Sequence, residues 1–114
     1  MSAITTHVLD TSRGVPAAGV PVLLEMLEAS GTWRPIGRGA TDPDGRLRTL
    51  VPQGEALQVG VYRMTFTTVQ YFEELGIDAF YPRVVIEFET AAGQSHYHVP
   101  LLLSPFGYTT YRGS

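Results

Sequence analysis

The stretch His96-Tyr97-His98-Val99-Pro100-Leu101-Leu102-Leu103-Ser104-Pro105-Phe106-Gly107-Tyr108-Thr109-Thr110-Tyr111-Arg112-Gly113-Ser114 is the most informative part of the sequence. Two histidines stand two residues apart at the start of an apolar run that is typical of a β-strand. Pro105 and Gly107 then favour a turn, and residues 108–112 are expected to form a second strand. A hairpin of this kind would lay the polar tail beside the strand that carries the histidines.

Strand patterns also dominate the rest of the sequence. Apolar and β-branched runs bounded by turn residues predict strands at 4–9, 20–27, 32–40, 46–51, 58–67, 84–88 and 97–103. The segment Asp42-Pro43-Asp44-Gly45 is a strong turn signal. Helix-forming residues followed by Gly76 predict one short helix at 69–76. Short strands with turns at intervals of about ten residues indicate a β-sandwich.

Side-chain alternation predicts which residues fill the core. In residues 58–67 it places Tyr62, Met64 and Phe66 on one face, which we expect to be buried. We also expect Trp33 and Phe88 in the core. Three aspartates are interpreted as turn residues whose side chains bind nearby backbone groups, namely Asp10, Asp42 and Asp44.

Length and composition limit the classes of protein to consider. A chain of 114 residues fits a single domain, 1–114, and 44% apolar residues are typical of a globular protein. The formal net charge of −3 gives no reason to expect a nucleic-acid partner. The sequence contains no cysteine, no visible signal peptide and no apolar stretch of membrane-spanning length, so we expect a soluble cytoplasmic protein with no membrane association.

Several motifs together resemble the 5-hydroxyisourate hydrolase family, the enzymatic relatives of transthyretin. They are Thr5-Thr6-His7-Val8-Leu9-Asp10-Thr11 with Gly14, Pro16 and Ala17, then Thr41-Asp42-Pro43-Asp44-Gly45-Arg46, Phe80-Tyr81-Pro82 and the terminal Tyr111-Arg112-Gly113-Ser114. The resemblance covers nearly the whole chain. The vertebrate hormone carrier lacks the histidines and the terminal pattern, so the sequence is more similar to the hydrolase.

The resemblance implies an all-β, transthyretin-like (prealbumin-like) sandwich of two four-stranded sheets with one short α-helix. It implies a homotetramer, a dimer of dimers, with sites in the central channel. The implied reaction is hydrolysis of 5-hydroxyisourate to 2-oxo-4-hydroxy-4-carboxy-5-ureidoimidazoline in urate catabolism, without a metal or other cofactor. By position, the implied catalytic residues are His7, Arg46, His98, Tyr111 and Ser114, and the implied substrate-binding residues are His7, Arg46, Tyr111, Arg112 and Gly113.

These residue types suit the opening of a cyclic amide. An imidazole can act as general base or general acid near neutral pH, and either His7 or His98 could take the proton from water. The guanidinium of Arg46 can hold carbonyl oxygens and stabilise developing negative charge. His96 is interpreted as a structural or surface residue that shares a face with His98 and could line the entrance of the site.

Three other functions remain open at this stage. Three histidines, two of them spaced i and i+2, could form a zinc site with an open position, which would indicate a metal hydrolase. A carrier could use the same channel to bind an aromatic ligand, because fold does not dictate function. A purely structural sandwich domain is the third alternative. Channel polarity separates the carrier from the hydrolase, because a carrier would need apolar and small residues where this sequence offers imidazoles, arginine and hydroxyls.

Overall fold

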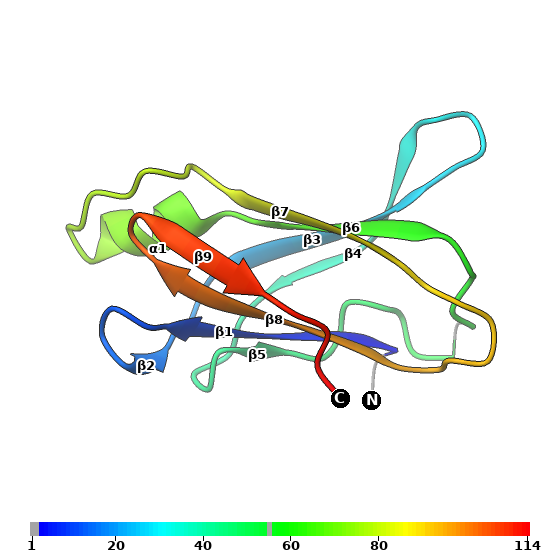
Figure 1. Cartoon of the computed structure of the whole chain (residues 1–114), viewed down its shortest axis with the longest axis horizontal. Coiled ribbons are helices and arrows are strands. Elements are labelled where there is room, and N and C mark those ends of the chain that lie inside the picture. Colours follow the sequence, from blue (N-terminus) through cyan, green and yellow to red (C-terminus); the bar gives the residue numbers. More distant parts are fainter. Residues whose placement is uncertain (1–2, 55) are drawn as a thin grey trace.

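Two β-sheets pack against each other in the computed structural model, which describes residues 3–54 and 56–114 (Figure 1). The first sheet has the order β2-β1-β8-β9, and β5 also pairs with β1. Its strands are β1 (Ile4–Asp10), β2 (Val15–Pro16), β5 (Arg46–Leu47), β8 (Tyr97–Ser104) and β9 (Gly107–Thr110). The second sheet has the order β4-β3-β6-β7. Its strands are β3 (Pro21–Leu27), β4 (Trp33–Ala40), β6 (Val61–Phe66) and β7 (Val84–Glu89).

The core lies between the sheets and is built by alternating side chains. In β6, Tyr62, Met64 and Phe66 are buried, which confirms the face predicted from the sequence. In β8, the residues at odd-numbered positions, which alternate with His98, point inward, among them Val99 and Leu101. The other face of each strand is therefore left for the surface, and the predicted β-sandwich is confirmed.

Two details of the first sheet differ from the sequence prediction. The described part of this sheet has five strands rather than four, because residues 15–16 pair with the end of β1. The strand expected at 46–51 ends at Leu47, because Leu50 and Val51 turn into the core instead of continuing the pairing. The backbone of Leu50 passes so close to Gly37 that a Cβ there would overlap the Leu50 carbonyl.

The expectation that Trp33 belongs to the core is wrong. Its ring is only partly buried, and the guanidinium of Arg63 lies 4.2 Å from the ring centroid. Nε of Arg63 also donates to Oε1 of Glu25 at 2.7 Å. Phe88 fits the prediction better, because it packs against the core and stacks on Tyr62 with a centroid distance of 5.9 Å.

One helix, α1 (Thr68–Glu74), connects β6 to β7, and Gly76 follows it with a φ of 69°, as the predicted glycine stop requires. The hydroxyl of Tyr71 in α1 donates to Oδ2 of Asp10 at 2.8 Å and so ties the helix to β1. Asp10 also accepts the backbone N–H groups of Ser12 and Arg13, as expected of a turn residue, but it is fully buried. None of the helices in the described ranges has the length and apolar character needed to cross a bilayer.

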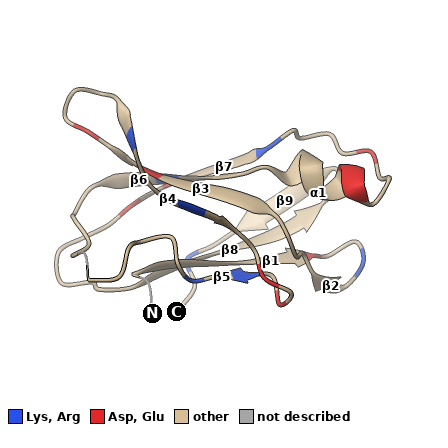
Figure 2. Cartoon of the chain, turned by 180° about the vertical axis from the view of Figure 1, so that it is seen from behind, with Lys and Arg blue, Asp and Glu red and all other residues tan. Residues whose placement is uncertain are grey.

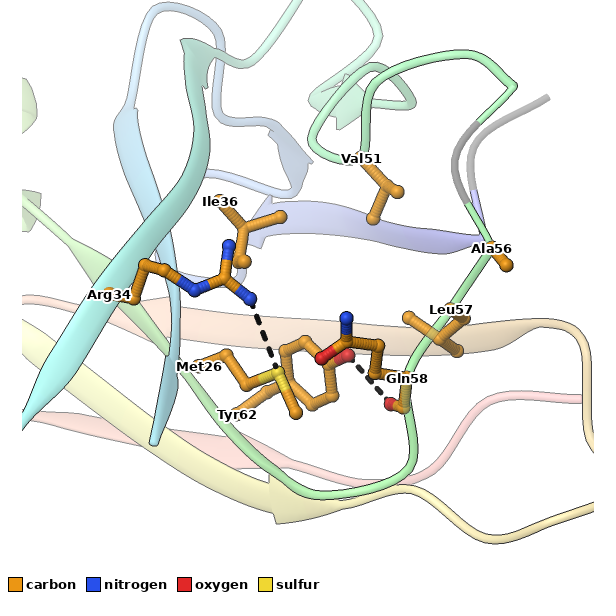
Figure 3. Close-up of a pocket in the computed structure, with 8 residues that line it drawn as sticks. All are labelled: Met26, Arg34, Ile36, Val51, Ala56, Leu57, Gln58 and Tyr62. Atoms are coloured by element: carbon orange, nitrogen blue, oxygen red, sulfur yellow. Dashed lines mark hydrogen bonds between the residues drawn. The ribbon is translucent and has the colours of Figure 1, made fainter. Parts of the chain in front are cut away.

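A small hollow opens between the sheets near β4 and the segment that precedes β6 (Figure 3). The hydroxyl of Tyr62 donates to the carbonyl of Gln58 at its rim, and Nη2 of Arg34 lies 3.9 Å from the sulfur of Met26. Most of the remaining lining is aliphatic, from Ile36, Val51, Ala56 and Leu57. No histidine lines this hollow, so the histidine-containing site predicted from the sequence lies elsewhere.

Candidate active site

The polar residues of interest meet on the outer face of the first sheet. Strands β1 and β8 are parallel and bring Thr5 opposite His98. Strands β1 and β5 are antiparallel and bring His7 opposite Arg46. Because alternate residues of a strand share a face, Thr5 and His7 point to the same side of β1. Three segments that are remote in the sequence therefore supply one polar surface.

A solvent-open pocket of about 270 Å³ lies on this surface. Of the residues predicted from the sequence, it brings together Arg46, His98 and Ser114. His96 also lines it, as its shared face with His98 suggested. The remaining lining residues are Thr5, Thr6 and Arg48, which the sequence analysis did not single out.

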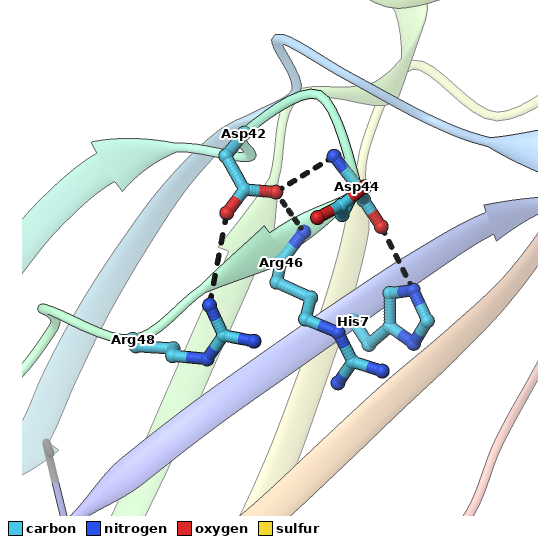
Figure 4. Close-up of polar contacts among 5 residues, drawn as sticks. All are labelled: His7, Asp42, Asp44, Arg46 and Arg48. Atoms are coloured by element: carbon cyan, nitrogen blue, oxygen red, sulfur yellow. Dashed lines mark hydrogen bonds and ion pairs between the residues drawn. The ribbon is translucent and has the colours of Figure 1, made fainter.

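The turn before β5 determines where Arg46 lies (Figure 4). Oδ1 of Asp42 accepts the backbone N–H groups of Asp44 and Arg46, both at 2.9 Å. The hydrogen bond from the Arg46 N–H is the main cause that lowers the pKa of Asp42. Gly45 has a φ of 78°, and a Cβ there would stand 2.4 Å from the Val8 carbonyl, so only glycine fits. The turn thus fastens the start of β5 to β1.

His7 lies beside this turn rather than among the residues that line the pocket. Its Nε2 is 2.9 Å from the carbonyl oxygen of Asp44 (Figure 4). A carbonyl can only accept, so Nε2 carries the hydrogen and donates it. Arginine on β5 is shown in blue in Figure 2. Arg48, just beyond β5, forms a long ion pair of 3.9 Å with Asp42.

His98 is held by a threonine of the neighbouring strand β1. Its Nδ1 lies 2.8 Å from Oγ1 of Thr5. Burial lowers the pKa of His98, and the positive potential of Arg46 acts in the same direction, followed by His7, His96 and Arg48. The imidazole is therefore predominantly neutral at neutral pH. A neutral imidazole can accept a proton at one ring nitrogen and donate a hydrogen bond from the other.

The terminal residues divide into two groups. Gly113 pairs with His98, and its N–H donates to the His98 carbonyl at 2.8 Å. Ser114 then reaches the pocket. Tyr111 and Arg112 leave β9, which ends at Thr110 rather than at residue 112 as predicted.

Tyr111 and Arg112 line a neighbouring groove together with residues of β7 and β8. The guanidinium of Arg112 lies 5.0 Å from the ring centroid of Tyr97, and its Nη2 donates to Oε1 of Gln94 at 3.4 Å. Tyr111 remains 56% exposed. Of the residues that the structure describes, only His98 lines both the groove and the pocket. Within one chain, the tail residues predicted to belong to the site therefore lie on two sides of His98. Ser114 lies in the pocket, and Tyr111 and Arg112 lie in the groove.

The residues that sequence reasoning missed carried only a partial signal. Alternation along β1 puts Thr5 on the face of His7, and alternation after the turn puts Arg48 on the face of Arg46. The pairing of Thr5 with His98 depends on which strands become neighbours, and no local pattern specifies that. Among residues 3–54 and 56–114, no three His, Cys, Asp or Glu side chains gather in a way that could hold a metal ion.

Comparison with known proteins agrees with the fold. A family model described as HIUase/Transthyretin family matches residues 4–113. The chain is 47% identical over 111 residues to a 5-hydroxyisourate hydrolase of Salmonella dublin, covering 97% of this chain and 80% of the relative. The solved 5-hydroxyisourate hydrolase of Klebsiella pneumoniae is 36% identical, with a TM-score of 0.85 and full coverage of both chains.

A solved sea bream transthyretin in complex with thyroxine is also similar, at 33% identity and a TM-score of 0.91, covering 97% of this chain and 94% of the other. The fold is therefore shared by an enzyme and by a thyroxine-binding protein. Together, the family model that spans almost the whole chain and these relatives establish that the chain belongs to the HIUase/Transthyretin family.

Proposed function

We propose that this chain hydrolyses 5-hydroxyisourate to 2-oxo-4-hydroxy-4-carboxy-5-ureidoimidazoline. One observation carries the proposal: Arg46, His98 and Ser114 line a single polar pocket although they come from β5, β8 and the end of the chain. This combination supplies a cation, an imidazole and a hydroxyl, which are the groups that opening a cyclic amide requires. The 47% identity to a hydrolase of this name supports the choice of substrate.

Each group has a separate task in the proposed reaction. Arg46 holds a carbonyl oxygen of the substrate and stabilises the negative charge that develops when water attacks the ring carbonyl carbon. An imidazole, from His7 or His98, takes the proton of that water, and the imidazolium so formed returns a proton to the ring nitrogen as the amide C–N bond breaks. Ser114 orients the substrate or the water through its hydroxyl. None of these tasks calls for a metal.

We also propose a homotetramer, a dimer of dimers, with the sites in a central channel. The pocket lies on an open sheet face, and a second copy facing it would cover the substrate and exclude water. Tyr111 is more than half exposed and lines the groove that adjoins the pocket at His98. It is therefore available to bind substrate once that channel forms. Arg112 and Gly113 would then bind substrate, and Gly113 would also hold the backbone of the tail against His98.

A carrier of aromatic ligands is the second candidate, because the thyroxine-bound sea bream transthyretin has nearly the same fold. The lining of the pocket argues for hydrolysis instead. Two arginines, two histidines, two threonines and a serine form it, and such a lining suits a polar, hydrogen-bonding substrate better than an apolar one.

The test is an ultraviolet assay of 5-hydroxyisourate generated in situ from urate by a urate oxidase. We expect the untagged chain to accelerate decay far beyond the spontaneous rate, and we expect a chelator to leave the rate unchanged. A folded, untagged sample that gives no acceleration would refute the proposal. Loss of activity with chelator would point to a metal hydrolase, and tight thyroxine binding without turnover would point to the carrier.

A further inference from the structure

One contact in the site that the proposed mechanism does not use joins Thr5 to His98. Thr5 is 5% exposed, and its Oγ1 lies 2.8 Å from Nδ1 of His98. Within the described part of the chain, this is the only hydrogen bond recorded for the Thr5 side chain. On the other side of the ring, a Cβ at Gly113 would stand 2.6 Å from Cδ2 of His98. The imidazole is therefore fixed by one hydrogen bond and one close backbone contact.

The positions of the protons follow from counting donors and acceptors. A neutral imidazole carries one ring hydrogen, and a hydroxyl has one hydrogen to donate. If Thr5 accepted a hydrogen from Nδ1, its own O–H would find no protein acceptor among residues 3–54 and 56–114 and would depend on water in the open pocket. Since Thr5 is only 5% exposed, a partner within the protein is favoured. If Thr5 donates to Nδ1, both groups are satisfied and the ring hydrogen must sit on Nε2.

We propose that Thr5 is a positioning residue: its hydroxyl donates to Nδ1 of His98 and so holds this histidine in the Nε2–H tautomer, as a hydrogen-bond donor toward a substrate carbonyl oxygen. No protein partner for Nε2 is recorded within the described residues, and His98 lines the pocket, so this donor is left for a ligand. The role in catalysis rests on the proposed hydrolase function.

The same reasoning gives His7 the opposite character. Its Nε2 donates to the Asp44 carbonyl, so a neutral His7 keeps its lone pair on Nδ1. The two histidines then have different functions: His98 donates a hydrogen bond, and His7 is the ring able to accept a proton. Neutral His98 is further supported by its burial and by the nearby cation Arg46, which both lower its pKa.

The tautomer can be read directly by NMR on the full chain with ¹⁵N-labelled histidine. Above the imidazole titration range, long-range proton–nitrogen correlations should show His98 protonated at Nε2 and unprotonated at Nδ1. A spectrum of His98→Gln assigns the signals, since the chain has three histidines. Thr5→Val should convert His98 to a mixture of tautomers, and Thr5→Ser should preserve the wild-type pattern. Protonation at Nδ1 in the wild type would overturn the proposal.

Kinetics test whether the tautomer matters to the reaction. Thr5→Val should lower kcat about tenfold, the worth of roughly one hydrogen bond, with a smaller change in KM. Thr5→Ser should restore kcat. Thr11→Val is the matched control, because it removes a threonine hydroxyl that bonds the Leu103 carbonyl at the other end of the same strand pair. It should leave both the tautomer and kcat unchanged.

The two proposals fail in different ways. If the wild type does not hydrolyse 5-hydroxyisourate, the proposed function fails, while the NMR tautomer still decides whether Thr5 controls His98. If the wild type is active and Thr5→Val changes neither tautomer nor kcat, the positioning role of Thr5 fails alone. A changed tautomer with unchanged kcat would likewise refute the effect of Thr5 on the reaction. If Thr5→Val does not fold, the wild-type and Thr5→Ser spectra still decide the tautomer.

Discussion

Gly113 lies directly against the imidazole of His98. Its N–H donates to the His98 carbonyl at 2.8 Å, and a Cβ placed on it would stand 2.6 Å from Cδ2 of the ring. The backbone of Gly113 therefore packs against one side of the His98 ring and limits where that ring can lie. The tail and β8 act as a unit, although β9 itself ends at Thr110.

This contact predicts a large effect of Gly113→Ala. The added methyl group must push the imidazole or the tail aside, which misplaces His98 and Ser114 together. We expect turnover to fall by about 10²-fold, as for other ångström-scale misplacements of catalytic groups. Gly107→Ala is the matched control, because a Cβ there meets only Oγ of Ser104 at 3.7 Å. Equal activity of the two variants would contradict the role assigned to Gly113.

Extending the chain beyond Ser114 should cripple the enzyme without unfolding it. Ser114 lines the pocket together with Arg46 and His98, so added residues would occupy space meant for substrate. The comparison is between the untagged chain and a series with one, three and ten added residues. Activity should fall while the melting temperature stays the same. Full activity in a carboxy-terminally tagged chain would count against this arrangement.

Alanine variants of His7, Arg46 and His98 should each lose most turnover and retain the oligomer. For Arg46→Ala we expect a loss of about 10²–10³ in kcat, typical of removing one charge-stabilising donor. Arg38→Ala is the control, because Arg38 belongs to β4 in the other sheet. For each variant, turnover of 5-hydroxyisourate is measured, and the oligomeric state is measured by size-exclusion chromatography. Dissociation of one variant would show that its residue is also structural.

His98 should titrate below the ordinary imidazole pKa of 6.5, because burial and neighbouring positive groups disfavour its charged form. Arg46→Ala should raise the pKa of His98 without restoring the ordinary value, since burial is the larger cause. Arg38→Ala should leave it unchanged. Proton NMR titration of the imidazole measures all three values. A pKa of His98 above 6.5 in the wild type would contradict the structure.

The same shift predicts how His98 affects stability. As pH falls below about 6.5, the unfolded chain takes up a proton that folded His98 still resists. The contribution of His98 therefore disfavours the folded state increasingly through this window, until the folded pKa is passed. His98→Gln removes the titrating group, so the pH dependence of its urea midpoint should be flatter between these two pKa values. Identical pH profiles would contradict this expectation.

Tyr71→Phe should destabilise the fold through Asp10. The hydroxyl of Tyr71 donates to a fully buried carboxylate, and burial raises the pKa of Tyr71, so the hydroxyl stays protonated. Losing a hydrogen bond to a charged group costs about 1.5–3 kcal/mol. Tyr81→Phe is the control, since Tyr81 is 39% exposed and makes ring contacts. Urea denaturation should separate the two variants, and equal midpoints would refute the role of Tyr71.

Much of this fold could be predicted from local patterns. Alternation in β6 assigned Tyr62, Met64 and Phe66 to the core, and the segment 42–45 formed the predicted turn before Arg46. Gly76 ends the helix segment with the positive φ that its residue type permits. These features depend on neighbours in the sequence, so short-range steric and hydrogen-bonding rules are sufficient for them.

Other local predictions failed where long-range packing decided the outcome. Trp33 is a large aromatic residue of a type that often lies in the core. It nevertheless lies on the outer face, where Arg63 stacks on its ring. The strand predicted at 46–51 ends at Leu47, and Leu50 and Val51 lie outside it and are buried in the core. Tyr111 and Arg112 left β9 and line a separate groove. In each case burial or a contact with a distant strand outweighed the local preference.

The sequence by itself determined which side chains of β6 face the core, and through its motifs it indicated the family and the histidine, arginine and tail residues of the candidate site. Only the tertiary structure decided that Thr5 stands beside His98 and His7 beside Arg46. The physical reason is that alternation fixes the face of a side chain but not the neighbouring strand or its register. A shift of one residue in that pairing would turn every side chain of the strand to the opposite face.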